Sequence, residues 1–257
     1  MFKILRDNIR NYFLANSGIE RHIVLAEFPK CGGTYLHSIL NTLISYENKN
    51  FNYSNISTFS NGLDLDMIKP NRYRNVINSY TQKQLLIKTH QNYSKCFHKV
   101  ICLYRDPIEV FKSFYNMRKS YLNNKLTFSR FIRGKSGVKS YIKFYQTYLN
   151  TPQKVRIMFV DYKDVITKTE TIKDILYFIF GILIDEKEIE NIIKANNKQI
   201  AIEEEAIYAK YDLRRKLYPQ IKFTNNKRYN YEIDIEEINF ITEETREICN
   251  LLGMNNS

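Results

Sequence analysis

The chain has 257 residues, of which 44% are hydrophobic, enough to bury a full core in one large α/β domain or in two small ones. Lys and Arg outnumber Asp and Glu by 39 to 27, and the formal charge of +12 favours an anionic partner such as a nucleotide, a polysaccharide, a nucleic acid or an acidic membrane. The 4 cysteines form no CxxC pair, which argues against a disulfide scaffold or a zinc site and favours a reducing, cytoplasmic location.

Residues 1–18 are expected to form a short amphipathic helix, because their apolar side chains fall roughly on one face. These side chains are Phe2, Leu5, Ile9, Tyr12 and Phe13. Two roles stay open for this helix: packing on the domain, or peripheral contact with a membrane through its basic residues. No apolar run in the sequence reaches the ~18 residues expected of a membrane span.

Four compact apolar runs indicate buried strands, and stretches with helical spacing lie between and after them. The expected strands cover residues 22–28, 84–90, 99–106 and 154–160. The expected helices cover residues 34–46, 107–117, 128–133, 138–149 and 166–180, followed by a mostly helical, charged stretch over 186–252. Residues 48–80 are polar and weakly periodic, so we expect an irregular segment there.

This alternation of strands and helices predicts an α/β fold with a central parallel sheet flanked by helices on both faces. We expect a single domain over residues 1–257. Its nucleotide-binding core is expected over residues 22–166, and a mostly helical remainder over 167–257.

The sequence FPKCGGTY, from Phe28 to Tyr35, joins the first strand to the first helix. It fits either a tight structural turn or a phosphate cradle, in which glycine lets backbone N–H groups approach an anion. It is not a Walker A loop, because its lysine precedes the glycines. The buried strand before it and the helix N-terminus after it favour a strand–phosphate-loop–helix nucleotide site. The residues of this predicted cradle are Lys30, Cys31, Gly32, Gly33, Thr34 and Tyr35.

The ends of the next two strands carry further candidate residues. Lys88 and His90 lie two positions apart at a strand end and so point the same way, and histidine is well suited to take a proton from a hydroxyl near neutral pH. Arg105 leaves the third strand, and Ser113 follows in the next helix, a pair that suits a second phosphate. Structural alternatives are a strand-end histidine and an arginine that only caps the helix.

In this order, these segments resemble those of the sulfotransferase family that uses 3′-phosphoadenosine 5′-phosphosulfate (PAPS). FPKCGGTY resembles the family's 5′-phosphosulfate loop, Tyr-Pro-Lys-Ser-Gly-Thr-Thr-Trp. Lys88-Thr89-His90 matches the family's Lys-Thr-His, which holds the catalytic base of cytosolic members. Further matches are to the 3′-phosphate motif, through Arg105, Pro107, Val110 and Ser113, and to a Tyr-Glu-Asp-Leu motif, through Tyr162-Lys163-Asp164-Val165.

The chain departs from the family pattern at three places. Cys31 replaces a serine, and Tyr35 replaces the tryptophan that stacks on adenine in many members. The late Arg-Lys-Gly loop, another 3′-phosphate contact of the family, has no clear counterpart. In NNKRYNYE (225–232), Arg228 is the candidate substitute, with a solvated basic loop as the alternative.

The resemblance implies sulfuryl transfer from PAPS to a hydroxyl or amine acceptor, leaving adenosine 3′,5′-bisphosphate (PAP). His90 would take the acceptor's proton, Lys30 would meet the charge growing on the bridging oxygen, and Lys88 would stabilise the sulfuryl oxygens. Gly32, Gly33, Thr34 and Tyr35 would hold the 5′ end and the base, while Arg105, Ser113 and Arg228 would hold the 3′-phosphate. Tyr162 is a further candidate for binding the nucleotide. No metal is required.

Two alternatives remain from the sequence. One is another nucleotide-dependent transferase or kinase with an atypical phosphate loop, and the other is a non-catalytic basic module that binds anions. No known nucleic-acid-binding motif occurs, so nucleic acid is not an expected partner. Residues 48–80 and 196–224 are polar, basic and rich in tyrosine, which favours a polar acceptor such as a saccharide over a small apolar phenol.

Overall fold

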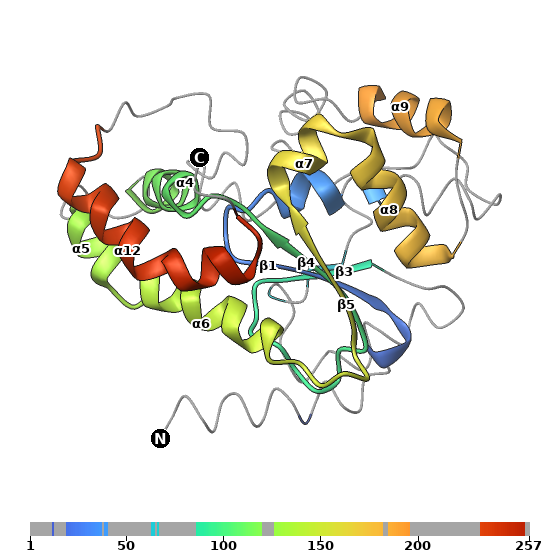
Figure 1. Ribbon diagram of the computed structural model, residues 1–257, viewed down its shortest axis with the longest axis horizontal. Helices are drawn as coiled ribbons and strands as arrows, with labels where there is room; N and C mark the ends of the chain where they lie inside the picture. The colour runs from blue at the N-terminus through green and yellow to red at the C-terminus, as the bar shows by residue number, and fades with distance from the viewer. Residues whose placement is uncertain are drawn as a thin grey trace, which may run out of the picture.

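A parallel sheet forms the centre of the fold (Figure 1). The computed structural model describes Tyr12 and residues 19–37, 39–40, 63–64, 66, 86–119, 126–181, 185–195 and 232–254. Within these ranges the sheet has five strands in the order β2-β3-β1-β4-β5. Their bounds in chain order are β1 Ile23–Glu27, β2 Leu63–Asp64, β3 Leu86–Thr89, β4 Lys99–Tyr104 and β5 Arg156–Asp161.

The three central strands are almost wholly buried, as expected for apolar runs in a parallel sheet that is covered on both faces. Leu25 of β1 lies opposite Lys88 of β3, and Glu27 of β1 lies opposite Leu103 of β4. Because all these strands run in the same direction, the segments that follow β1, β3 and β4 emerge at one edge of the sheet. Most of the candidate residues that the sequence indicates lie in these segments or at the strand ends before them.

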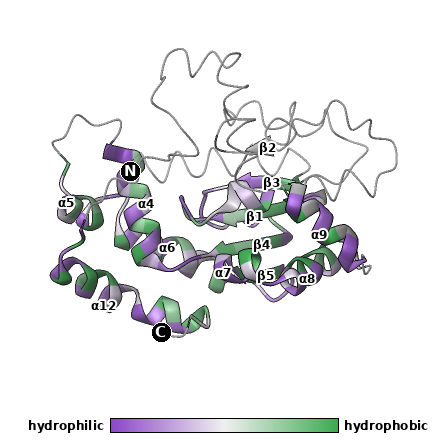
Figure 2. Ribbon diagram, turned by 90° about the horizontal axis from the view of Figure 1, so that it is seen from above, coloured by the Kyte–Doolittle hydropathy of each residue, from purple (hydrophilic) through white to green (hydrophobic). Residues whose placement is uncertain are grey.

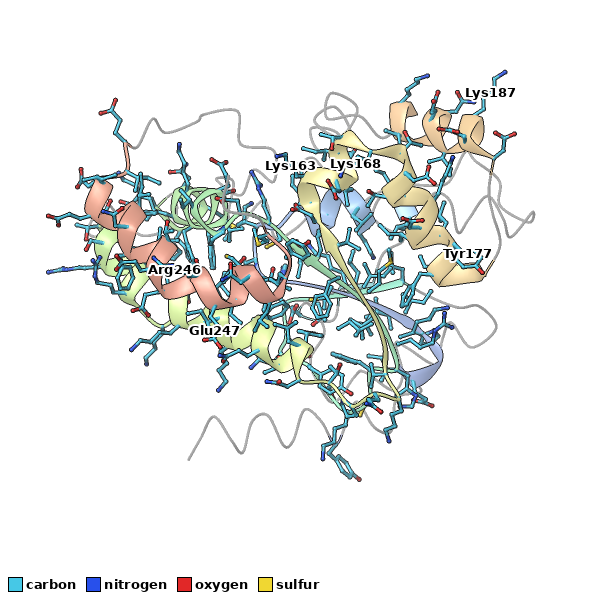
Figure 3. All side chains as sticks on the ribbon, viewed as in Figure 1. Lys163, Lys168, Tyr177, Lys187, Arg246 and Glu247 are labelled. Atoms are coloured by element: carbon cyan, nitrogen blue, oxygen red, sulfur yellow. The ribbon has the colours of Figure 1, made fainter. Side chains whose placement is uncertain are left out.

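Helices cover both faces of the sheet, as the alternating pattern predicts (Figures 1 and 2). One group comprises α4 Pro107–Lys119, α5 Phe128–Arg133, α6 Val138–Leu149 and α12 Ile235–Leu251. The other comprises α7 Tyr162–Thr167, α8 Thr169–Phe180 and α9 Glu186–Ala195, and a 3-10 turn, η1 Ile19–Arg21, precedes β1. Charged side chains such as Lys187 and Arg246 extend outward from these helices (Figure 3).

Helix α6 is hydrogen-bonded to the backbone at the ends of β3 and β4 through tyrosines that lie on one of its faces. Tyr141, Tyr145 and Tyr148 are fully buried, and each donates its hydroxyl hydrogen to a backbone carbonyl. The acceptors are the carbonyls of Arg105, Leu103 and Gln91, at 3.0, 3.0 and 2.7 Å. Buried tyrosine needs such a partner for its polar end, so these side chains fill the core and also fix the backbone near the candidate site.

An aromatic cluster packs around Phe28, the first residue after β1. The Phe28 ring packs edge-on against four other rings, with centroids 5.3–6.1 Å apart. These rings belong to Phe111, Phe114, Tyr141 and Phe144. Many of the chain's aromatic residues therefore serve as core, and through Phe28 the core extends to the first residue of the loop.

Within the described residues, the expected elements agree with the structure except in two places. The two-residue strand β2 lies in the segment that was expected to be irregular. The helix expected over residues 166–180 corresponds to α8, while its first two residues belong to the separate helix α7, because Lys168 between the two helices has an extended backbone with φ −127° and ψ 111°. Apart from Tyr12, the expected N-terminal helix lies outside the described residues, as do residues 196–231. In the described ranges, no helix is both long and apolar enough to cross a membrane.

Candidate active site

A sharp turn, the glycine loop (residues 28–34), joins β1 to the helix that begins at Gly33. The Cys31 N–H donates to the Phe28 carbonyl at 3.2 Å, and the Tyr35 N–H donates to the Gly32 carbonyl at 3.0 Å. Gly32 has φ 98°, a region that glycine enters without steric cost. Among the described residues, Lys30 is the single non-glycine with positive φ, at 78°. Such backbone conformations persist where the surroundings impose them, often at functional sites.

Close neighbours leave no room for a side chain at either glycine of the pair. A Cβ atom on Gly32 would lie 2.2 Å from the Tyr162 ring. A Cβ atom on Gly33 would lie 2.3 Å from the carboxyl carbon of Glu27. Glycine is therefore needed at both positions because two side chains, one aromatic and one charged, pack directly on the loop backbone.

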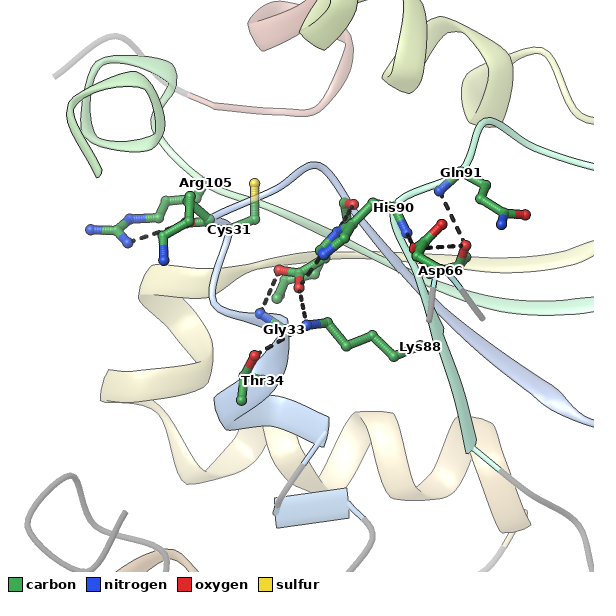
Figure 4. A network of polar contacts seen from close by, with 12 residues as sticks. Cys31, Gly33, Thr34, Asp66, Lys88, His90, Gln91 and Arg105 are labelled. Atoms are coloured by element: carbon green, nitrogen blue, oxygen red, sulfur yellow. Dashed lines mark hydrogen bonds and ion pairs between the residues drawn. The ribbon is translucent and has the colours of Figure 1, made fainter. Parts of the chain in front are cut away.

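The Glu27 carboxylate is the centre of the polar contacts at this edge, and its partners Gly33 and Lys88 are labelled in Figure 4. It is 2% exposed, accepts the Gly33 N–H through Oε2 at 2.5 Å, and pairs through Oε1 with the Lys88 ammonium at 3.0 Å. The Nδ1 atom of His90 lies 3.9 Å from the same Oε1. Burial alone would raise the pKa of Glu27, but Lys88, His90 and the Gly33 N–H together lower it below its ordinary value, so Glu27 is ionised at neutral pH.

Lys88 and His90 are held by further contacts at the end of β3. The Lys88 ammonium also donates to the Thr34 hydroxyl at 3.1 Å, which links β3 to the start of the helix after the loop. The His90 Nδ1 lies 3.0 Å from the Glu27 backbone carbonyl. Because a carbonyl only accepts, Nδ1 carries the hydrogen, which leaves Nε2 as the nitrogen that can take up a proton. The His90 backbone N–H donates to the Asp66 carboxylate at 2.6 Å.

Arg105 connects the end of β4 to the same loop. Its guanidinium donates to the Lys30 carbonyl at 3.5 Å, lies over the Tyr162 ring at 5.0 Å from the centroid, and pairs with Glu109 at 3.3 Å. Tyr162 is the first residue of α7, which Asp161 caps by accepting the Lys163 N–H at 2.8 Å. Burial raises the pKa of the Tyr162 phenol, although Arg105 acts in the opposite direction.

The structure thus joins most of the predicted site residues into one cluster by direct contacts. These residues are Lys30, Gly32, Gly33, Thr34, Lys88, His90, Arg105 and Tyr162. Half-buried Tyr35 belongs to the same region, where burial and then Tyr162 raise its pKa. Ser113 lies half-buried on α4, and Arg228 is outside the described residues.

The Cys31 side chain faces the core. It is fully buried, its Sγ lies 3.2 Å from the Tyr145 hydroxyl, and burial raises the pKa of the thiol far above its usual range. Only the backbone of Cys31 is therefore placed to contact a ligand in the loop. Among the described residues, no three His, Cys, Asp or Glu side chains gather in a way that could hold a metal ion.

Two residues of the cluster, Glu27 and Asp66, are absent from the sequence-based predictions. Glu27 did give a signal: it is a carboxylate at the end of an otherwise apolar strand, where burial requires partners of opposite charge. Asp66 lies within the polar segment 48–80, where nothing in the sequence distinguishes it from its neighbours.

Comparisons with known proteins bear on the family and the fold of the chain. A family model described as the sulfotransferase domain matches residues 20–201. Among solved structures, retinol dehydratase in a complex with retinol and PAP has a TM-score of 0.63 at 16% identity, covering 89% of this chain and 81% of that one. Mouse sulfotransferase SULT7A1 complexed with PAP has a TM-score of 0.62 at 16% identity, covering 94% and 91%. A search of curated proteins finds no match.

Proposed function

Because the chain belongs to the sulfotransferase domain family, we propose that it transfers a sulfuryl group from PAPS to the hydroxyl of an acceptor. One observation carries the proposal: the glycine loop, Lys88, His90 and Arg105 meet at the carboxyl edge of β1, β3 and β4. This edge is where ligands bind in open α/β sheets. That the solved neighbours were crystallised with PAP supports PAPS as the donor for this chain.

The donor binds across the glycine loop and Arg105. The backbone N–H groups at the start of the helix and the Thr34 hydroxyl receive the 5′-phosphosulfate, and Lys30 supplies a countercharge. Arg105, held over the Tyr162 ring, receives the 3′-phosphate together with Ser113 of α4. The 3′-phosphate contact is what separates this donor from AMP and ATP.

Transfer is an in-line displacement at sulfur. The acceptor oxygen forms a bond to sulfur while the bond from sulfur to the bridging phosphate oxygen breaks, and the negative charge stays on the 5′-phosphate of PAP. The acceptor's proton passes to Nε2 of His90, whose Nδ1–H is held by the Glu27 carbonyl. Lys30 stabilises the negative charge on the bridging oxygen, and Lys88 stabilises the charge on the sulfuryl oxygens.

The acceptor site is proposed to include residues 48–80 and 196–224, whose polar and basic composition favours a saccharide or another polar hydroxyl compound. Incubation of the protein with PAPS labelled in its sulfuryl group, with panels of saccharides and phenols, tests both parts of the proposal. We expect label in a saccharide fraction together with release of PAP. Phosphoryl transfer from ATP with Mg²⁺, and no transfer of label from PAPS to any acceptor, would contradict the proposal and favour a kinase.

A further inference from the structure

The Glu27 carboxylate occupies the position at which the groups proposed to hold the donor converge. One of its oxygens accepts the Gly33 N–H at 2.5 Å, and the other pairs with Lys88 at 3.0 Å. Lys88 in turn reaches the Thr34 hydroxyl at 3.1 Å, and His90 Nδ1 lies 3.9 Å from the carboxylate (Figure 4). An amide and an ammonium thus hold an anion that belongs to the protein itself, and the Thr34 hydroxyl contacts this ammonium rather than the carboxylate.

This position is closed tightly around the carboxylate. A Cβ atom on Gly33 would lie 2.3 Å from the Glu27 carboxyl carbon, so the backbone of the loop is in direct contact with the charged group. With 2% of its side chain exposed, Glu27 excludes another anion from the same contacts. One N–H cannot donate a full hydrogen bond to both a carboxylate and a phosphate oxygen, and the two anions would repel each other at contact distance.

We propose that Glu27 is a built-in competitor of the donor: its carboxylate fills the anion position of the glycine loop in the empty protein and must leave it when PAPS or PAP binds. This inference rests on the proposed function, because it takes the Gly33 N–H and Lys88 as contacts of the 5′-phosphosulfate. Glu27 thereby lowers donor affinity while it keeps Lys88 and the loop ordered in the empty protein. When the donor binds, Lys88 separates from Glu27 and contacts the sulfuryl oxygens instead.

The alternative role for Glu27 is that of a fixed support, which orients Lys88 and His90 while the donor binds elsewhere on the loop. The two roles predict opposite signs for the removal of the carboxylate charge. A competitor, once neutralised, lets the donor bind more tightly. A support, once neutralised, leaves Lys88 and His90 less well positioned and weakens donor binding.

The test is calorimetric titration of the full chain with PAP, with AMP and, separately, with inorganic pyrophosphate. Glu27→Gln keeps the shape of the side chain, and Glu27→Ala removes it. Glu247→Gln removes one negative charge from an exposed position of α12 and serves as the control for net charge (Figure 3). Circular dichroism establishes that each variant is folded before its affinity is compared with that of the unchanged protein.

We expect both Glu27 variants to bind PAP about 10- to 100-fold more tightly than the unchanged protein and Glu247→Gln. This range corresponds to one charge-assisted hydrogen bond that PAP no longer has to break. Pyrophosphate affinity should rise in parallel. In a crystal of the unchanged protein with PAP, Glu27 should no longer accept the Gly33 N–H. Equal or weaker PAP binding in Glu27→Gln, or a PAP complex in which that hydrogen bond persists, would overturn the inference.

The outcomes also separate this inference from the proposed function. Tighter pyrophosphate binding in the Glu27 variants without preference for PAP over AMP would support the competitor and contradict the PAPS donor. Preference for PAP over AMP with equal affinity in all four proteins would support the donor and overturn the competitor. No binding of any of these probes to any variant would overturn both.

Discussion

The buried ion pair between Lys88 and Glu27 makes a quantitative prediction for Lys88→Met. Lys88 is 10% and Glu27 2% exposed, so removal of the ammonium leaves an ionised carboxylate in a site that is closed to water. Removal of one partner from a buried pair costs about 3–5 kcal/mol of folding free energy. The Gly33 N–H still donates to Glu27 at 2.5 Å, which places the expected loss near the lower limit, at about 3 kcal/mol.

A double-mutant cycle measures this loss and identifies its cause. In urea unfolding at pH 7, Lys88→Met should lower the free energy of unfolding by about 3 kcal/mol, and the midpoint by about 1 M. Neutralisation of the stranded charge in Lys88→Met/Glu27→Gln should recover most of the loss, giving a coupling of about 1–3 kcal/mol. Lys173→Met, which removes surface ion pairs with Glu170 and Glu186, is the control and should leave the urea midpoint almost unchanged. Additive effects of the two substitutions would refute the account of Glu27 as an ionised, paired carboxylate.

Three further predictions concern the same edge of the sheet. His90→Ala should slow release of PAP from PAPS in the presence of acceptor by about 10²–10⁴-fold while PAP affinity in calorimetry stays unchanged; equal slowing in the exposed control His98→Ala would argue against a base at His90. Gly32→Ala should abolish PAP binding and lower the melting temperature, because its Cβ would lie 2.2 Å from the Tyr162 ring; a variant that binds PAP normally would show that the ring does not pack on the loop. Because the pKa of Glu27 is lowered by folding, the stability that its ionisation contributes is present above its ordinary pKa of 4.5 and lost as pH falls through its folded value. The difference in unfolding free energy between the unchanged protein and Glu27→Gln should therefore narrow in acid, and a difference independent of pH from 7 down to about 3 would contradict this.

The sheet was predictable because its strands carry strong local signals. Ile23–Glu27, Leu86–Thr89 and Lys99–Tyr104 lie in continuous apolar runs, which are typical of parallel strands covered on both faces. The candidate residues were predictable for a related reason: the segments after these strands meet at one edge of the sheet whatever the details of packing. The split between α7 and α8 was missed because Lys168 carries no helix-breaking signal, and its extended backbone depends on tertiary context.

The internal chemistry of the site depends on pairings between strands that local sequence does not encode. Glu27 and Lys88 are far apart in the chain, and only the alignment of β1 with β3 brings the carboxylate to the ammonium. The hydroxyls of Tyr141 and Tyr145 likewise reach carbonyls of another element, whereas the sequence indicates only that the rings belong to a core. Apolar periodicity predicts which face of an element is buried, but it does not predict the partner of a polar atom.

The central claim is that the glycine loop and Arg105 form a site for a nucleotide with a 3′-phosphate. Calorimetric titration with PAP, AMP and ATP with Mg²⁺ tests it most directly, with Arg105→Ala as the variant and Arg246→Ala, on exposed α12, as the control. The account predicts that PAP binds more tightly than AMP or ATP, and that Arg105→Ala loses this preference while Arg246→Ala keeps it. Equal binding of PAP and AMP to the unchanged protein would contradict a PAPS site and leave a general phosphate-binding loop.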